Sequence, residues 1–286
     1  MLKKTPILAA IVLATAIAAA GAPSPVTLVI CGPGYPGTTK EAQPSMDALA
    51  SAASKAAGWS PSRLAAEYHE SEEAGLARLK APSPSIAMVP LPFYLAHRTD
   101  LKLVAKAQAV EKDGKAAVTW TLVAKKGQVT SAASLAGYRI VSLAAYAPDF
   151  IRKVALAPWG ALPADVTFEA SGQVLAALRK SANGDKVAVL LDTAQAKSLS
   201  TLPFAAELEI VATSPQVPGI LVCTVRTAVN ATAANQLVAG LLKLNQSPEG
   251  LAALDAIHLA KFVALDTKGL AKARAAYAAA KAAKAR

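Results

Sequence analysis

The stretch Val26-Thr-Leu-Val-Ile30, followed at once by Cys31-Gly-Pro-Gly-Tyr-Pro-Gly37, sets the pattern on which the chain is built. The first part is short, apolar and rich in β-branched residues, which indicates a buried strand. The second part is dense in glycine and proline and predicts a loop. Apolar residues then follow at helical spacing from Met46 to Ala57, and Gly58 ends the run. Strand, loop and helix in this order predict a parallel α/β unit.

The same order of elements recurs along the chain. Leu64–Tyr68 and Ile86–Val89 predict two more strands, with a helix over Glu72–Lys80 between them. A longer strand is expected over Ala117–Lys125. Strands and helices then alternate again, so the second half of the chain repeats the order of elements of the first half. From Asn230 onward the spacing of apolar residues is helical. The elements predicted in the second half cover Tyr138–Leu143, Phe150–Leu156, Val166–Ala170, Val174–Lys180, Val187–Leu191, Leu208–Ala212 and Ile220–Val225.

The N-terminus is typical of an export signal. Met1-Leu2-Lys3-Lys4 is basic, the run from Pro6 to Ala20 is apolar, and small residues at Ala18–Ala20 suit cleavage. We therefore predict that residues 1–22 are a cleaved signal peptide. An uncleaved membrane anchor is the alternative, because the apolar run approaches the length that spans a bilayer.

The composition excludes several classes of protein. With 53% hydrophobic and 17% charged residues in 286, the chain is too apolar to be disordered. The net charge of +11 permits nucleic-acid binding, but the charge is spread along the chain and aromatic residues are 5%, so we expect no nucleic-acid partner. Cys31 and Cys223 are the only cysteines, and a disulfide between them is possible in an exported protein.

Neither an enzyme nor a metal site is predicted. His69, His97 and His258 each stand alone, and the acids that flank His69 do not complete a spaced set of metal ligands. No phosphate-cradling glycine loop with lysine and no nucleophile elbow occurs. We therefore expect no catalytic residue, no metal and no cofactor.

Six motifs follow one another between residues 26 and 265. They are Tyr35-Pro36 after the first strand, Met88–Ala96, Ser131–Val141, Asp185–Asp192, Val211–Pro218 and Gln246–Leu254. Together they resemble the phosphate/phosphite/phosphonate-type periplasmic solute-binding proteins of ABC transporters. The resemblance implies an α/β protein with the two-lobed type 2 periplasmic-binding-protein architecture.

That architecture implies a division of the chain. Lobe 1 would comprise residues 23–118 plus 220–286, lobe 2 residues 119–219, and the chain would cross between them near Thr119 and again near Pro218. A basic, exposed helical tail is expected from Thr267. Each sheet would present the carboxyl ends of its strands to the cleft, and the lobes would close over the ligand.

The resemblance also implies a function. The protein would be a monomer in the periplasm that captures a small molecule and delivers it to an ABC transporter permease, touching the membrane only through the transporter. A periplasmic carrier of lipid or apolar ligands, or a sensor without its own permease, is the alternative.

The loops after the strands supply the candidate ligand-binding residues. The resemblance carries over directly to Tyr35, Tyr94 and Asp192. A half-buried tyrosine on a loop, or a helix N-cap in the case of Asp192, is the structural alternative for each. The other candidates in these loops are Thr38, Thr39, Phe93, Ser142, Tyr146 and Gln173.

The loop over 142–149 departs from the family. Phosphonate-binding members hold the anion there with hydroxyl residues and backbone N–H groups, whereas this chain has alanines, Pro148 and Asp149. Two like charges at about 4 Å repel by about 4 kcal/mol at an effective dielectric near 20. Gln173 also replaces a histidine of the family. We therefore predict an uncharged or partly apolar ligand, with phosphate binding through Gly34, Gly37, Thr38 and Thr39 as the lesser alternative.

Overall fold

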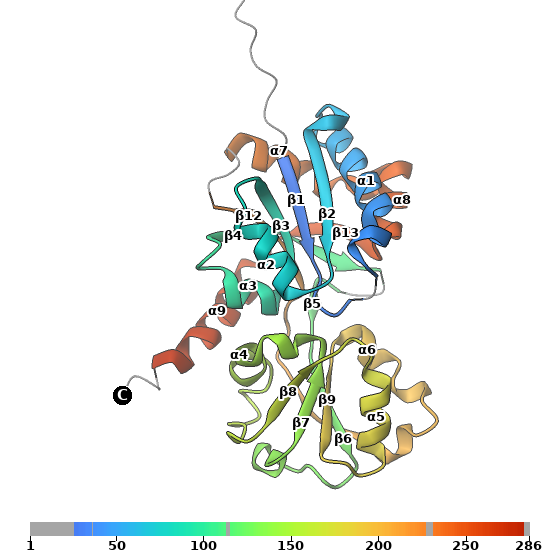
Figure 1. Cartoon of the computed structure of the whole chain (residues 1–286), viewed down its shortest axis with the longest axis vertical. Helices are drawn as coiled ribbons and strands as arrows, with labels where there is room; N and C mark the ends of the chain where they lie inside the picture. The colour runs from blue at the N-terminus through green and yellow to red at the C-terminus, as the bar shows by residue number, and fades with distance from the viewer. Residues whose placement is uncertain (1–25, 36, 113–114, 227–230, 283–286) are drawn as a thin grey trace, which may run out of the picture.

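Two β-sheets, one in each of two lobes stacked along the long axis, organise the molecule (Figure 1). The computed structural model describes residues 26–35, 37–112, 115–226 and 231–282. Both sheets mix parallel and antiparallel strands and carry helices on their faces. The predicted two-lobed α/β fold is therefore confirmed.

The upper lobe contains a six-stranded sheet in the order β13-β4-β12-β3-β1-β2. β1 pairs in parallel with β2 and β3, and β12 runs antiparallel to β3 and β4. Its strands come from both ends of the described chain. They are β1 Val26–Cys31, β2 Leu64–His69, β3 Pro84–Pro90, β4 Leu103–Glu111, β12 Ile220–Val225 and β13 Leu259–Ala264.

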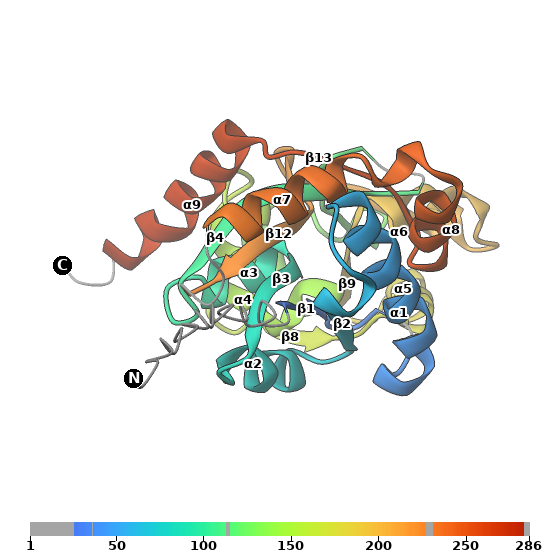
Figure 2. The same ribbon diagram turned by 90° about the horizontal axis from the view of Figure 1, so that it is seen from above.

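Helices cover both faces of this sheet (Figure 2). α1, α7 and α8 pack on one face, where Leu28 and Ile30 of β1 point. α2 and α3 lie on the opposite face, toward which Val29 and Cys31 point. The helices of this lobe are α1 Thr39–Ala56, α2 Glu72–Lys80, α3 Leu91–His97, α7 Ala231–Leu242, α8 Pro248–Ala256 and α9 Thr267–Ala282, with short turns at Pro61–Arg63 and Leu244–Gln246.

The lower lobe contains a five-stranded sheet in the order β10-β6-β9-β7-β8. β7 pairs in parallel with β8 and β9, while β6 runs antiparallel to β9 and β10. The strands are β6 Thr121–Lys125, β7 Arg139–Ser142, β8 Thr167–Ala170, β9 Val187–Leu191 and β10 Leu208–Thr213. The helical segments are η2 Ala132–Leu135, η3 Leu143–Tyr146, α4 Pro148–Phe150, the π-helical turn η4 Ile151–Ala155, α5 Val174–Ala182, α6 Thr193–Lys197, η5 Leu199–Thr201 and η6 Ala205–Glu207.

Two short strands join the lobes. β5 (Ala117–Val118) and β11 (Val217–Pro218) pair in antiparallel fashion at the crossing. Beyond them, the Trp120 N–H donates to Ser214 Oγ at 2.9 Å, and the Ser214 N–H donates to the Trp120 carbonyl at 2.8 Å. The two crossings are therefore bonded to each other and form one double-stranded hinge.

Several sequence predictions differ from the structure. The single strand expected over Ala117–Lys125 is broken at residues 119 and 120, because the chain changes sheets there. The loop expected after β3 is wrong, since helix α3 begins at Leu91. β4 and β13 were not predicted: both contain lysine and alanine, which weakens the pattern of a strand.

The two ends of the chain also differ from expectation. α9 is a helix, as predicted, but it is not a free tail, because Leu270 and Ala273 are buried in the core and the helix contacts β11 and η4. The predicted signal peptide lies outside the described residues. Within the described part of the chain, no helix has both the length and the apolar character to span a bilayer.

The possible disulfide is not formed. Cys31 and Cys223 are both free and buried in the same apolar cluster. Burial raises the pKa of the Cys31 thiol to about 12, so the thiol stays protonated. Cys31 packs directly beneath α2, where Gly75 makes the close approach possible.

Replacing Gly75 by alanine tests this packing. A Cβ at Gly75 would overlap Cys31 Sγ and lie 2.8 Å from Cys31 Cβ. Overpacking of this kind costs roughly 1–3 kcal/mol in the free energy of unfolding, measured by urea denaturation. Adding Cys31→Ala removes the overlapping sulfur, so the double variant loses less than the sum of the two single variants. Additive losses would contradict the contact.

Candidate functional site

A cavity of about 30 Å³ lies between the lobes beside the hinge, with room for about two water molecules. It sits where strands of both sheets end: Tyr35 follows β1, Glu111 ends β4 and Asp192 follows β9. Open α/β sheets bind ligands at such edges. Its lining comprises Tyr35, Pro90, Leu91, Pro92, Ala109, Glu111, Lys115, Val118, Trp120, Asp192, Thr193, Pro218, Gly219 and Ile220.

Tyr35 and Glu111 form the polar wall contributed by lobe 1. The Tyr35 hydroxyl donates to Glu111 Oε1 at 3.2 Å. Burial, followed by the nearby charge of Glu111, raises the pKa of Tyr35 well above its ordinary value. Tyr35 therefore remains a hydrogen-bond donor at any physiological pH. The loop that carries it is fixed to the end of β2, where the Tyr68 hydroxyl donates to the Gly32 and Tyr35 carbonyls at 3.3 and 3.4 Å.

Glu111 faces Asp192 of lobe 2, so two carboxylates meet at the cavity. Burial, followed by the charge of Asp192, raises the pKa of Glu111, while the Tyr35 hydrogen bond and Lys197 oppose the shift. Burial also raises the pKa of Asp192. Lys115 lines the same cavity but is exposed to solvent. Glu111 is half-buried and Asp192 is buried, so the less exposed ionisable groups of the cavity are acidic, which disfavours an anion.

Asp192 has two roles in the structure. It is the N-cap of α6, with its carboxylate accepting the Gln195 N–H at 2.8 Å, as the structural alternative anticipated. It also lines the cavity at the hinge. The next residue, Thr193, holds the crossing, because its hydroxyl accepts the Thr119 N–H at 2.9 Å and donates to the Thr119 carbonyl at 3.1 Å.

Thr38 and Thr39 begin α1, away from the cavity lining. The Thr38 N–H donates to Glu41 Oε2 at 2.9 Å. Both the N–H and the hydroxyl of Thr39 donate to Glu70 Oε2, at 3.1 and 2.7 Å, and these bonds hold the pKa of Glu70 below its ordinary value. The chain's own carboxylates thus occupy the donors that phosphate would need here.

Phe93 and Tyr94 lie on α3 rather than on a loop. Their side chains are 0% and 2% exposed and belong to the apolar core, and the Phe93 ring packs on His97 with centroids 4.7 Å apart. Neither residue lines the cavity. The sequence treated the segment after Pro90 as a loop, and its folding into a helix turns both rings inward.

Ser142 and Gln173 do not reach the cavity either. The Ser142 hydroxyl is fully buried, donates to the Leu190 carbonyl at 2.7 Å and accepts the Ala144 N–H at 3.2 Å. It therefore caps the following turn of its own lobe. Gln173 is exposed, and its N–H donates to Ser171 Oγ at 3.1 Å.

Tyr146 lines a second hollow of about 20 Å³ next to the first. Its hydroxyl oxygen is buried and makes no hydrogen bond of good geometry, although the Phe93 N–H is close. Burial raises its pKa well above the ordinary value. Tyr35 and Trp120 line both hollows, so Tyr35, Tyr146 and Asp192 are the sequence-predicted residues that the structure brings together.

The sequence missed several lining residues. Glu111 ends β4, which was not predicted, and Trp120 follows the hinge strand β5. The Trp120 indole N–H is buried without a partner, at 7% exposure for the whole residue. Among the residues that the structure describes, no group of three or more His, Cys, Asp or Glu side chains is placed to hold a metal ion.

Paired sheets, a double-stranded hinge and a cavity at the facing strand ends define a two-lobed type 2 periplasmic binding protein. The family described as ABC transporter, phosphonate, periplasmic substrate-binding protein matches residues 86–270, and the chain belongs to this family. The resemblance stated from the six motifs is thereby confirmed. The family consists of periplasmic solute-binding proteins of transporters and not of enzymes.

Solved structures share the fold. XAC2383 from Xanthomonas citri, bound to chloride, is 12% identical with a TM-score of 0.70, covering 90% of this chain and 99% of its own. PhnD1 from Prochlorococcus marinus, in complex with methylphosphonate, is 14% identical with a TM-score of 0.64, covering 90% and 98%. The binding-protein component of an ABC phosphonate transporter from Pseudomonas aeruginosa is 17% identical with a TM-score of 0.60, covering 89% and 86%. No curated protein matches the chain in sequence.

Replacing Glu111 by glutamine tests the acidic character of the cavity. Because burial raises the folded-state pKa of Glu111, the native state binds its proton more readily than the unfolded state, and this group makes the protein more stable as pH falls from neutral through the folded pKa. Glu111→Gln removes that titration and keeps an acceptor for Tyr35. We expect higher stability at neutral pH and a weaker pH dependence in urea denaturation from the ordinary pKa of a glutamate up to neutral pH.

Glu73→Gln is the matched control, because Glu73 is exposed on α2. It should leave the pH dependence of the unfolding free energy unchanged. An unchanged dependence in Glu111→Gln as well would show that the Glu111 carboxylate is solvated in the folded protein.

Proposed function

We propose that this protein captures a small ligand between its lobes and delivers it to the permease of an ABC transporter. The lobes are residues 23–118 plus 220–286 and residues 119–219, with 1–22 removed as a signal peptide. The observation that carries the proposal is the cavity at the hinge, whose lining combines Tyr35 and Glu111 of lobe 1 with Asp192 of lobe 2. No chemical step is assigned to it, and the protein is not an enzyme.

The ligand proposed is uncharged or partly apolar, and not a phosphonate held in the usual way. The solved structure of PhnD1 is a complex with methylphosphonate. In this chain Glu111 and Asp192 line the cavity instead, and the Ser142 hydroxyl donates to a carbonyl of its own lobe. An anion at about 4 Å from one of these carboxylates meets about 4 kcal/mol of repulsion at an effective dielectric near 20. Apolar side chains such as Leu91, Val118 and Ile220 complete the lining.

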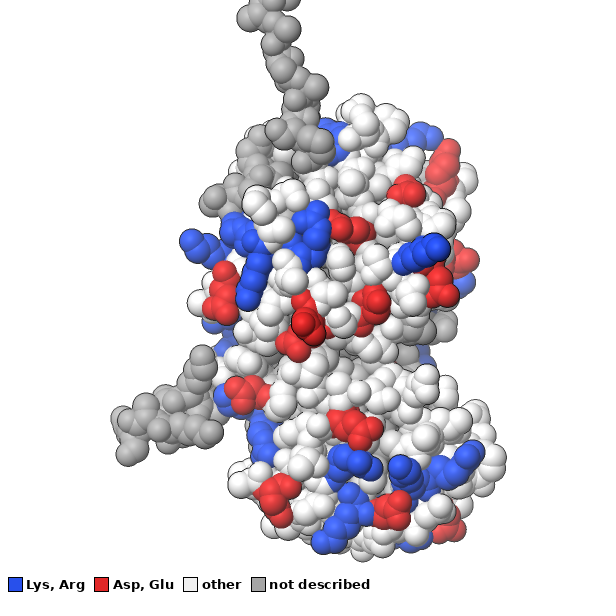
Figure 3. All heavy atoms as spheres, viewed as in Figure 1, with Lys and Arg blue, Asp and Glu red and all other residues white. Residues whose placement is uncertain are grey.

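The protein is proposed to act as a monomer in the periplasm, without a nucleic-acid partner. On the face in Figure 3, basic and acidic side chains are interspersed over both lobes, with no continuous basic surface. Nucleic-acid binding depends on such a surface. A carrier of apolar ligands or a sensor without a permease is the second candidate, which the mostly apolar lining of the cavity favours.

Calorimetric titration with methylphosphonate and with phosphate tests the class of ligand. We expect no micromolar binding of either by the natural protein, because the half-buried Glu111 and the buried Asp192 repel the anion. The double variant Glu111→Gln/Asp192→Asn removes both charges and keeps the N-cap, since asparagine caps as well as aspartate. It should bind methylphosphonate at least tenfold more tightly than the natural protein.

Micromolar binding of either anion by the natural protein would overturn the proposed ligand class but leave capture intact. Native mass spectrometry of the freshly purified protein tests capture itself. A species heavier than the chain by the mass of one small molecule is expected, and its loss in Trp120→Ala would place it at the hinge. A uniformly ligand-free protein that binds nothing from a periplasmic metabolite extract would count against capture.

A further inference from the structure

The lobes touch at a second place, away from the hinge, and there the backbones approach very closely. Gly34 follows β1 in lobe 1, and Gly172 follows β8 in lobe 2. A Cβ on Gly172 would overlap the Gly34 carbonyl oxygen, and a Cβ on Gly34 would lie 2.8 Å from Leu143 Cδ2. Glycine at both positions therefore allows the loop after β1 and the loop after β8 to come into contact.

The turn η3 of lobe 2 packs next to these two loops. Leu143 is 7% exposed, and its side chain reaches Gly34 of the opposite lobe. Tyr146 extends in the same direction, and its buried hydroxyl lies close enough to Cys31, Glu72 and the Phe93 N–H of lobe 1 for each to influence it. We name Leu143 and Tyr146 the interlobe plug.

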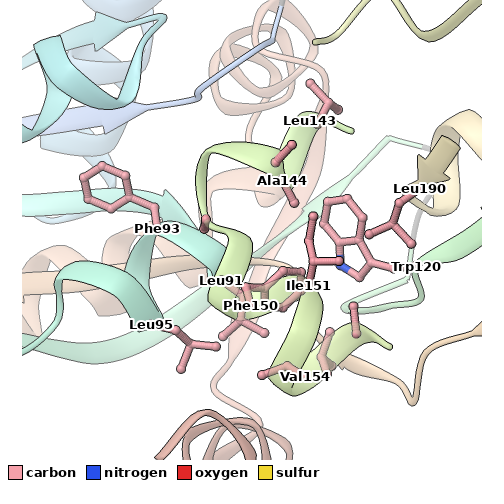
Figure 4. Close-up of a cluster of buried hydrophobic side chains, with 14 of the residues drawn as sticks. Leu91, Phe93, Leu95, Trp120, Leu143, Ala144, Phe150, Ile151, Val154 and Leu190 are labelled. Atoms are coloured by element: carbon pink, nitrogen blue, oxygen red, sulfur yellow. The ribbon is translucent and has the colours of Figure 1, made fainter. Parts of the chain in front are cut away.

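Apolar packing continues from the plug to the hinge (Figure 4). Leu91 and Leu95 of α3 belong to the same buried cluster as Ile151 and Val154 of lobe 2. The Phe150 ring meets Trp120 edge-on, with centroids 5.5 Å apart and planes at 71°. One hydrophobic core thus runs through both lobes along this seam.

α9 adds a further contact across the lobes. It follows β13 of lobe 1 yet contacts the hinge strand β11 and η4 of lobe 2. Lys153 of η4 lies 5.4 Å above the Tyr277 ring of α9 and bonds to Asp149 Oδ2 at 2.7 Å. This helix therefore also favours the closed arrangement.

We propose that the interlobe plug holds the lobes closed without a ligand, so that Leu143 and Tyr146 fill much of the cleft and leave the hinge cavity for selection of the ligand. A ligand shifts an open–closed equilibrium only by its difference in affinity for the two states, and side chains attached to the chain act on that equilibrium at all times. The closed form is then the resting form.

The experiment measures the distance between the lobes in protein freed of ligand by unfolding and refolding, with native mass spectrometry as the check. Spin labels on Glu73→Cys of α2 and Ala176→Cys of α5 report the separation, and both positions are exposed. The native thiols are buried and should not compete for label. Ligand-free natural protein is expected to give one short distance.

Tyr146→Ala is expected to raise the open-to-closed ratio at least tenfold and to add a longer distance. Tyr146→Phe is the matched control: it keeps the ring and removes only the unpartnered hydroxyl, so it should stay closed. Leu143→Ala, which trims the second plug residue, should also open the lobes and serves if Tyr146→Ala does not fold, as judged by circular dichroism. An open ligand-free natural protein, or plug variants that stay closed, would overturn the proposal.

Discussion

The double-stranded hinge is the constraint on which the rest of the molecule depends. Trp120 and Ser214 exchange two hydrogen bonds, and β5 pairs with β11, so both crossings of the chain are fixed to each other. This link brings the carboxyl ends of both sheets to one seam and allows a rotation about the link with little other distortion. The cavity, the facing carboxylates and the apolar seam all follow from that placement.

The chain's own groups satisfy several of the backbone donors that a bound phosphonate would need. The N–H groups of Thr38 and Thr39 bond to Glu41 and Glu70, and the Ala144 N–H bonds to Ser142. Most buried polar groups in proteins are hydrogen-bonded. In this chain internal oxygens therefore occupy these donors, while Glu111 and Asp192 face the cavity.

Short-range patterns predicted the fold well, and the site less well. Strands such as Val26–Cys31 and Ile220–Val225 are apolar and rich in β-branched residues, so their own sequence is enough to predict that they are buried. Phe93 and Tyr94 were placed in a loop because two prolines flank Leu91, although proline is well tolerated in the first turn of a helix. Glu111 could not be found, because its importance comes from Asp192, which is distant in sequence and belongs to the other lobe.

The topology also sets an order of events for the nascent chain. Lobe 2 is continuous, and its sheet is complete once β10 has ended at Thr213. In lobe 1, β3 lies at the centre of the sheet, and one of its neighbours is β12, more than a hundred residues later. Until that neighbour emerges, β3 exposes an unpaired edge, which is a known starting point for aggregation. The part of the chain made first must therefore finish folding last.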